Sequence, residues 1–200
     1  MVRMKTDDID KFFEYGISIP TRTIYMGSMS PVGDDNESGV DFAMAEYTVK
    51  GLHVLDNHNN ANGDKPIMIL MNNVGGDVYH GQAIYDAIKA CKSYVTIKTI
   101  GHAMSMGSII LQAADHRVMS PNSTMMIHYG YWGFDGTPKA FEKWAEESKR
   151  IHGWMENVYL DRLRERDEKF CAKKLRDWLS ADTFFTSQQA VELGLADEVV

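Results

Sequence analysis

The middle of the chain alternates short apolar runs with amphipathic segments. Residues 67–71 form a continuous apolar run after a proline, which is typical of a strand buried on both faces. Residues 79–90 have a helical pattern, and the β-branched, alternating run 94–100 predicts a second strand. A further helix and two short strands are expected at 104–114, 117–119 and 125–127. This order predicts an α/β core of parallel strands joined by crossover helices.

The C-terminal part of the chain has a different pattern. Residues 138 to about 165 form a long, highly charged amphipathic segment that contains Trp and Met. The pattern fits a helix that projects from the core and packs on another molecule, and it fits a solvated helix on its own domain equally well. A shorter helix is expected at 168–179, followed by a strand, a helix and a closing strand. The polar stretches 27–39 and 56–66 predict loops too short to separate domains, so we expect one domain over 1–200.

Composition narrows the classes of partner. The chain has 200 residues, of which 44% are hydrophobic and 24% charged, as in an ordinary globular domain with a sizeable core. The net charge of −7 disfavours a nucleic-acid partner, because phosphate binding requires a basic surface. The sequence lacks a signal-peptide pattern and an apolar run of about 18 residues, so no membrane partner is expected. Cys91 and Cys171 lack metal-ligand spacing and indicate a reducing compartment, so we expect a cytoplasmic protein of a bacterium, or of a host cell if a phage encodes it.

Ser105 is the first residue with candidate chemistry. It lies in the sequence GHAMSMG, at a strand-to-helix junction among small residues. At such a junction the free N–H groups and the helix dipole favour developing negative charge, as in a nucleophile elbow with Ala103 in place of the first glycine. A serine near a helix start is more often only a cap, and the local sequence leaves both interpretations open.

Gly75 and Gly76 follow the first apolar strand, in the sequence NNVGGD. Paired glycines let the backbone approach a ligand closely, and the N–H groups of Gly76 and Met106 are candidates for an oxyanion hole. A tight strand-to-helix turn explains the pair equally well. A phosphate loop is disfavoured, because no Gly-Lys-Ser/Thr sequence follows.

His128 ends an apolar strand and precedes a loop rich in glycine and aromatic residues. Lone histidines are more often structural or surface residues than catalytic ones. Asp182, in the sequence SADTFF, is by its neighbours typical of a cap or a turn. The other histidines have no comparable setting, and we expect no metal site, because no ligand set is organised for one.

Four segments together resemble the ClpP-type serine peptidases. GHAMSMGS is similar to the nucleophile motif of that family, and NSTMMIH is similar to its histidine motif. DTFFTSQQAVELGLAD resembles the segment that carries the catalytic aspartate, and NNVGG stands where the family has Asn-Ser-Pro-Gly-Gly. The four segments occur in the family's order, and the similarity runs from about Ile17 to Val200.

The resemblance implies a ClpP/crotonase-like spiral of βαβ units, with an N-terminal extension at 1–16 and a protruding handle helix at about 138–165. It also implies that Ser105 is the nucleophile, His128 the general base and Asp182 the residue that orients the base. The N–H groups of Gly76 and Met106 would form the oxyanion hole. Four further residues would contact the substrate: Val74, Gly75, Tyr129 and Gly130.

A member of this family would hydrolyse peptide bonds of unfolded proteins or peptides through an acyl-enzyme, without a metal or organic cofactor. The partners that the resemblance implies are further copies of the chain in a stacked, ring-shaped homo-oligomer, polypeptide substrates, and an AAA+ ATPase unfoldase. The glycine-rich segment 130–136 would present an edge to which the substrate adds as a strand.

Two alternatives stay open at the level of sequence. A crotonase-type enzyme shares the architecture and an oxyanion hole but acts on acyl-CoA, and an inactive ClpP-like ring or scaffold subunit keeps the fold without hydrolysis. The chain departs from the ClpP pattern at Val74, where proline is usual, and at Tyr129-Gly130, where Gln-Pro is usual. The N-terminal region before Ile17 lacks an apolar hairpin, and this departure bears on docking to an unfoldase.

Overall fold

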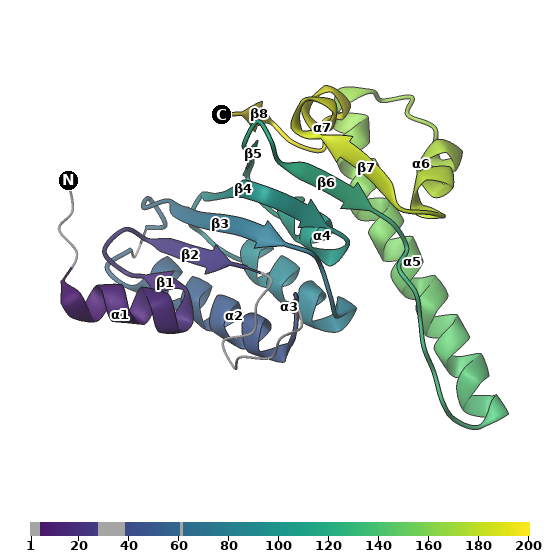
Figure 1. Ribbon diagram of the computed structural model, residues 1–200, viewed down its shortest axis with the longest axis horizontal. Coiled ribbons are helices and arrows are strands. Elements are labelled where there is room, and N and C mark those ends of the chain that lie inside the picture. The colour runs from purple at the N-terminus through teal and green to yellow at the C-terminus, as the bar shows by residue number, and fades with distance from the viewer. Residues whose placement is uncertain (1–4, 28–38, 61) are drawn as a thin grey trace.

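One sheet of eight strands organises the protein, as seen in a computed structural model that describes residues 5–27, 39–60 and 62–200 (Figure 1). The strands are β1 (Ile17–Ser18), β2 (Thr23–Met26), β3 (Ile67–Asn73), β4 (Val95–Met104), β5 (His116–Met119), β6 (Thr124–Ile127), β7 (Thr183–Thr186) and β8 (Glu198–Val199). Their order is β1-β2-β3-β4-β5-β8, with β6 paired to β4 and β7 paired to β6. The pairs β1–β2 and β6–β7 are antiparallel, and the other neighbours run parallel.

Helices connect the parallel strands, as the sequence predicts. The helices are α1 (Thr6–Tyr15), α2 (Phe42–Asn57), α3 (Val78–Lys89), α4 (Met106–Leu111), α5 (Pro138–Arg166), α6 (Ala172–Leu179) and α7 (Ser187–Leu193). The successive units β2–α2–β3, β3–α3–β4 and β4–α4–β5 each join neighbouring parallel strands. This arrangement confirms the α/β core of βαβ units.

The burial of β3 differs from the prediction. Its residues alternate between buried and half-buried, so the expectation of a strand buried on both faces is wrong. Figure 1 shows α2 and α3 on one side of β2 and β3, where they cover the fully buried Ile67, Ile69 and Met71. The side chains of Met68 and Leu70 point to the other face and stay half-buried in the single chain.

Strand β4 bends part-way along its length and changes partner. Thr96–Thr99 pair with β5, whereas His102, Ala103 and Met104 pair with β6. Gly101 lies between the two halves with φ +90°, a backbone conformation that favours glycine. The strand therefore runs on to Met104, and the helix expected at 104–114 is shortened to the six residues of α4.

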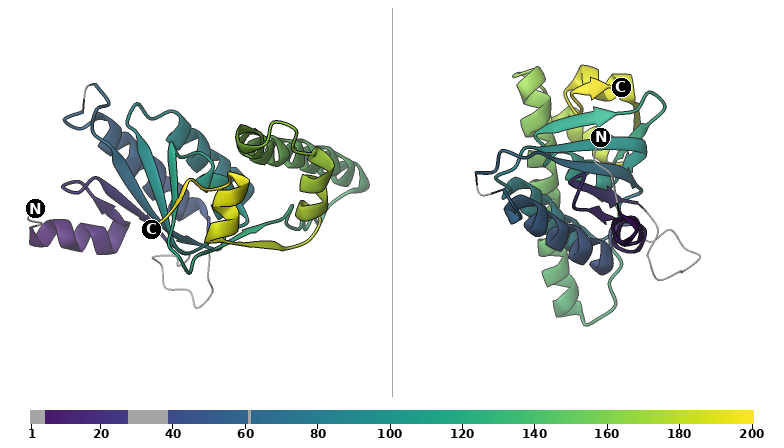
Figure 2. Two further views of the ribbon diagram at one scale, coloured as in Figure 1. Left: turned by 90° about the horizontal axis from the view of Figure 1, so that it is seen from above. Right: turned by 90° about the vertical axis from the view of Figure 1, so that its left-hand side faces the viewer.

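Helix α5 is the longest element, with 29 residues, and covers the segment where the sequence predicts a long charged helix. Thr137 caps its start by accepting a hydrogen bond from the N–H of Ala140, and Pro138 occupies the first turn. The buried residues of α5 begin near its middle and continue toward its C-terminal end: Ile151, Met155, Val158, Tyr159, Leu160 and Leu163. The N-terminal half extends away from the sheet (Figures 1 and 2), as expected for a projecting helix, and its packing on another molecule stays a prediction.

Other expectations were incomplete. The sequence pattern did not reveal α1 or α2, and α2 continues to Asn57, inside the stretch expected to be a loop. The loop expected at 27–39 falls mostly on residues 28–38, outside the described part of the chain. The helix expected at 168–179 begins only at Ala172. Among the described helices, none is long and apolar enough to cross a membrane.

A charged pair fastens the C-terminal segment to the core. The guanidinium of Arg117, only 4% exposed, hydrogen-bonds both carboxylate oxygens of Asp197, and the N–H of Arg117 donates to Asp197 Oδ2 at 2.7 Å. Arg117 also donates to the side chain of Gln112 and to the carbonyl of Gly194. These bonds join β5, the end of α4 and the turn after α7, so the buried charge has several partners.

Replacing Asp197 with asparagine is expected to lower Tm at neutral pH, on the order of 5 °C. Burial raises the pKa of Asp197, but the hydrogen bonds from Arg117 outweigh burial and hold the pKa below the ordinary 3.8. A carboxyl group whose folded-state pKa is lowered contributes stability above its unfolded-state pKa and loses that contribution as pH falls through the folded value. Thermal denaturation of parent and Asp197→Asn should therefore differ most near neutral pH and converge below pH 3.8. If the difference in Tm between the parent and Asp197→Asn were the same near neutral pH and below pH 3.8, the result would contradict this role of Asp197.

Candidate active site

Ser105 occupies a strained turn between β4 and α4. Its backbone has φ 50° and ψ −123°, a combination that non-glycine residues rarely adopt. The N–H of Ser105 donates to the carbonyl of Met126 at 2.9 Å, and its carbonyl accepts the N–H of Ser108 at 3.0 Å. The sharp turn between these two bonds presents the hydroxyl at the end of the sheet, which is the geometry of a nucleophile elbow.

His128 reaches Ser105 because β6 lies beside the end of β4. The parallel register aligns Ala103 with Met125 and Met104 with Met126, so both strands end at the same edge of the sheet. Ser105 and His128 follow directly at that edge. The Nε2 atom of His128 lies 2.8 Å from Ser105 Oγ, which is a hydrogen-bond distance.

Asp182 comes to His128 through the antiparallel pairing of β6 with β7. In that register Ile127 is opposite Thr183, which places the preceding Asp182 opposite His128. The Nδ1 atom of His128 lies 2.8 Å from Asp182 Oδ1. Because a carboxylate oxygen only accepts, Nδ1 carries the proton of a neutral imidazole, and Nε2 is left to accept from the hydroxyl of Ser105.

The turn after β3 passes close behind the serine. Gly75 has φ +98°, and a Cβ added to it would lie 2.5 Å from Ser105 Cβ and 2.9 Å from the nitrogen of Met106. No larger residue fits at this position without displacing the serine. The N–H of Gly75 is engaged by Asn73 Oδ1 at 2.8 Å, which fixes the turn.

Gly76 is held by a parallel bridge to Val40. The carbonyl of Gly75 accepts from the N–H of Val40 at 2.6 Å, and the N–H of Asp77 donates to the carbonyl of Val40 at 2.7 Å. Both neighbouring groups therefore face Val40. Because the carbonyl of Gly75 and the N–H of Gly76 point in opposite directions from one trans peptide group, the N–H of Gly76 faces away from Val40.

Comparison with known proteins decides the family. The family described as Clp protease matches residues 36–200. The chain belongs to the Clp protease family. It is 36% identical to an ATP-dependent Clp protease proteolytic subunit of Deinococcus radiodurans over 163 residues, which cover 80% of this chain and 76% of the relative. It is 28% identical to ATP-dependent Clp protease proteolytic subunit 2 of Pseudomonas aeruginosa, with 98% of this chain and 94% of the relative covered.

Membership confirms the identification made from the four sequence motifs. The relatives are proteolytic subunits, so this Clp protease is a serine-type peptidase. The mixed α/β sheet with its projecting helix is the ClpP fold. The acyl-CoA alternative, which rested on the shared architecture of the crotonases, has no support from these relatives.

A cavity of about 480 Å³ opens beside Ser105 and His128. It is lined by the six other residues that the sequence proposed for substrate and oxyanion contacts: Val74, Gly75, Gly76, Met106, Tyr129 and Gly130. Asp182 lies outside the lining, behind His128. Within the described ranges, no group of three or more His, Cys, Asp and Glu side chains is placed to hold a metal ion.

Sequence reasoning missed part of the cavity wall of this Clp protease. Ile151 and Met155 of α5 line the cavity, together with Met126 and Trp132. Both α5 residues are buried, and their spacing of four places them on one face of the helix. That spacing is visible in the sequence, but it does not say what the face packs against.

Tyr129 anchors the loop that follows His128. Its hydroxyl donates to Glu156 Oε1 of α5 at 2.6 Å, and its N–H donates to the carbonyl of Leu179 at 2.8 Å. Burial, together with the neighbouring Glu156 carboxylate, raises the pKa of Tyr129 well above its usual range, so the hydroxyl remains a donor. The residue next to His128 is thereby fixed to both α5 and the end of α6.

Gly75→Ala should impair the enzyme more than it impairs folding. The added methyl group would push against Ser105, and a displacement of a reacting side chain of about 1 Å lowers kcat/KM by about 10²-fold. The measurement is peptide hydrolysis together with thermal denaturation. Gly153→Ala on α5 is the matched control, because its added Cβ would meet no atom within 4 Å. Full activity in Gly75→Ala would mean that the turn does not need glycine.

Proposed function

We propose that this Clp protease is an endopeptidase that cuts peptide bonds of unfolded proteins or peptides with Ser105, His128 and Asp182. The observation that carries the proposal is the unbroken relay Ser105 Oγ–His128 Nε2 and His128 Nδ1–Asp182 Oδ1, with 2.8 Å at each step. A serine hydroxyl is a poor nucleophile at neutral pH and needs a base that a third group orients. The relay meets both needs.

In the proposed reaction, His128 Nε2 takes the proton from Ser105 as Oγ attacks the scissile carbonyl carbon. The tetrahedral intermediate collapses when His128 returns the proton to the leaving amine, and the C–N bond breaks. The acyl-enzyme on Ser105 is then hydrolysed by a water molecule that His128 deprotonates. Asp182 stays ionised and stabilises the imidazolium that forms in each half of the cycle.

The oxyanion of each intermediate is proposed to bind to the N–H groups of Gly76 and Met106. Two features support this assignment: the N–H of Gly76 faces away from Val40, and Met106 is the first residue of α4, where an N–H has no acceptor within the helix. Donors of this kind stabilise charge where it develops in the transition state.

The substrate is proposed to lie along Val74 and Gly75 on one side and Tyr129 and Gly130 on the other. All four line the cavity beside Ser105. Residues 128–137 belong to no strand of the folded chain, so the backbone of the segment 130–136 is available for an added strand. The apolar wall from Met126, Ile151 and Met155 favours an apolar side chain at the cleaved position.

Ser105→Ala, His128→Ala and Asp182→Asn should each abolish most hydrolysis of casein and of a fluorogenic peptide. The expected loss is about 10⁴-fold, the size found when the aspartate of a serine-peptidase triad becomes asparagine. Thermal denaturation should show that all three variants remain folded. A Ser105→Ala variant as active as the parent would instead point to a ring or scaffold subunit without catalysis by this site.

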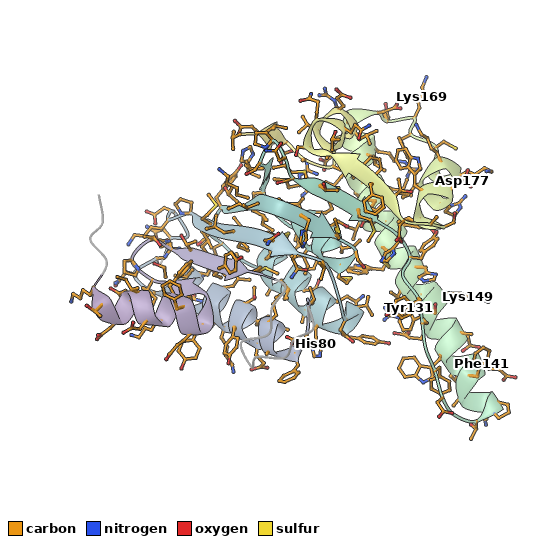
Figure 3. All side chains as sticks on the ribbon, viewed as in Figure 1. His80, Tyr131, Phe141, Lys149, Lys169 and Asp177 are labelled. Carbon is orange, nitrogen blue, oxygen red and sulfur yellow. The ribbon has the colours of Figure 1, made fainter. Side chains whose placement is uncertain are left out.

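The projecting half of α5 is proposed to join two rings of this chain face to face. Exposed aromatic side chains gather on this half of α5 and on the loop before it, with Phe141 62% and Tyr131 96% exposed (Figure 3). The rings of Trp132 and Phe134 lie 6.5 and 5.7 Å from that of Trp144. An aromatic surface of this kind is typical of a protein interface.

Phe141→Glu should separate the stacked rings, because a charge would have to be buried at the contact. Sedimentation velocity should show a species of about half the mass of the parent assembly. Lys169→Glu is the control, because Lys169 lies at the opposite end of α5 (Figure 3). Equal masses for parent and Phe141→Glu would place the contact elsewhere.

An AAA+ unfoldase is proposed to feed substrate to the ring. The support is the name of the relatives, each an ATP-dependent Clp protease subunit. The cytoplasmic location stays a prediction from the sequence.

A further inference from the structure

Two buried hydroxyl groups lie directly behind the nucleophile and are not part of the triad. The hydroxyl of Ser108 is 2.7 Å from the carbonyl oxygen of Ser105 and 2.6 Å from the hydroxyl of Tyr159. Ser108 and Tyr159 are both fully buried, with 0% exposure. Tyr159 belongs to α5, more than fifty positions along the chain, so this contact links α5 to the turn that holds the nucleophile.

The direction of the two hydrogen bonds follows from their chemistry. A carbonyl oxygen only accepts, so the single proton of Ser108 points to Ser105. Tyr159 must then donate its own proton to Ser108 Oγ. Burial raises the pKa of Tyr159 well above its usual range, so the phenol keeps the proton that it donates. The chain of donors runs one way, from Tyr159 through Ser108 to the carbonyl of Ser105.

We propose that Ser108 and Tyr159 are positioning residues that fix and polarise the peptide group between Ser105 and Met106. The inference rests on the proposed function, because the N–H of this peptide group belongs to Met106, a proposed oxyanion donor. The carbonyl oxygen and the N–H are two ends of one planar trans peptide, since the described chain contains no cis bond. Holding the oxygen therefore sets the direction of the N–H.

The carbonyl of Ser105 accepts three hydrogen bonds. It accepts the N–H of Ser108 at 3.0 Å, the N–H of Ile109 at 3.3 Å and the hydroxyl of Ser108 at 2.7 Å. The third of these bonds comes from outside the helix ladder. Hydrogen bonds to a carbonyl polarise its peptide group, which makes the N–H at the other end a stronger donor.

The same bonds also oppose the strain at Ser105. A residue with φ 50° and ψ −123° persists only where its surroundings hold it there. The N–H of Ser105 is held by Met126 at 2.9 Å, and the Ser108–Tyr159 pair holds the carbonyl end. Without the hydroxyl of Tyr159, Ser108 Oγ loses one of its two hydrogen bonds and is held less firmly against the carbonyl of Ser105, so the peptide group is less tightly fixed.

Tyr159→Phe tests the proposal, because it removes the hydroxyl and keeps the ring that packs in the core. We expect kcat for a peptide amide substrate to fall about tenfold, less than the roughly 10²–10³-fold loss when an oxyanion donor is removed outright. KM should stay unchanged, because the peptide group acts on the transition state. Affinity for a peptide boronic acid, which forms a tetrahedral adduct with Ser105, should fall by the same factor as kcat.

Two further variants separate positioning from simple packing. Ser108→Ala should lower kcat to a similar degree, and the double variant Ser108→Ala/Tyr159→Phe should be no slower than the slower single variant, because both residues act through one carbonyl. Tyr85→Phe is the matched control. Tyr85 is half-buried and packs edge-on against Trp154 of α5 at 5.6 Å, away from the cavity lining, and its variant should keep the parent kcat.

Parent values of kcat and boronic acid affinity in Tyr159→Phe would overturn the proposal. So would equal losses in Tyr159→Phe and Tyr85→Phe, or additive losses in the double variant, since either would indicate general loosening of α5. Sedimentation of each variant shows whether the assembly is intact. Failure of the proposed function can be told apart from failure of this inference. If Ser105 is not the nucleophile, Ser105→Ala retains activity, whatever the kcat of Tyr159→Phe.

Discussion

The parallel pairing of the second half of β4 with β6 sets the distance between Ser105 and His128. Two strands that end at the same sheet edge deliver a hydroxyl and an imidazole to within 2.8 Å of each other. The antiparallel addition of β7 then brings Asp182 to the far side of the imidazole. If the register between β4 and β6 moved by one residue, every side chain at this edge would change face, and the relay would be lost.

This pairing exists only because β4 changes partner. The first half of β4 pairs with β5, and the bend at Gly101 directs the second half to pair with β6. A β-branched or bulky residue at φ +90° would be strained, so one glycine allows the bend between the core sheet and the edge that carries Ser105 and His128. Gly75 has a related role on the other side, where it leaves room for the Ser105 side chain.

The sequence predicted features whose cause is local. The positions of the core strands β3 and β4, the long helix α5 and the glycine turn after β3 follow from periodicity and from residue type, and the four motifs together led to the family. Local pattern did not reveal the extent of burial on β3 or the short α4, because both depend on which elements pack or pair from a distance. Ile151, Met155 and Tyr159 were missed for the same reason: their helical spacing marks a buried face but not its partner.

Helix α5 links these features. The part of α5 from Ile151 onward contributes Ile151 and Met155 to the cavity wall, Glu156 to the anchor of Tyr129, and Tyr159 to the turn behind Ser105. Its other half projects with exposed aromatic side chains. The projecting half and the residues behind the serine therefore belong to one continuous helix of 29 residues.

The central claim is that one imidazole, steadied by one carboxylate, makes one hydroxyl reactive. Its most direct test is to treat the assembled protein with a fluorophosphonate and to locate the adduct by peptide mass spectrometry. The account predicts a single modified residue, Ser105, with labelling that slows strongly in His128→Ala. Casein hydrolysis by a protein that stays unlabelled at Ser105, or that is labelled at another serine, would contradict it.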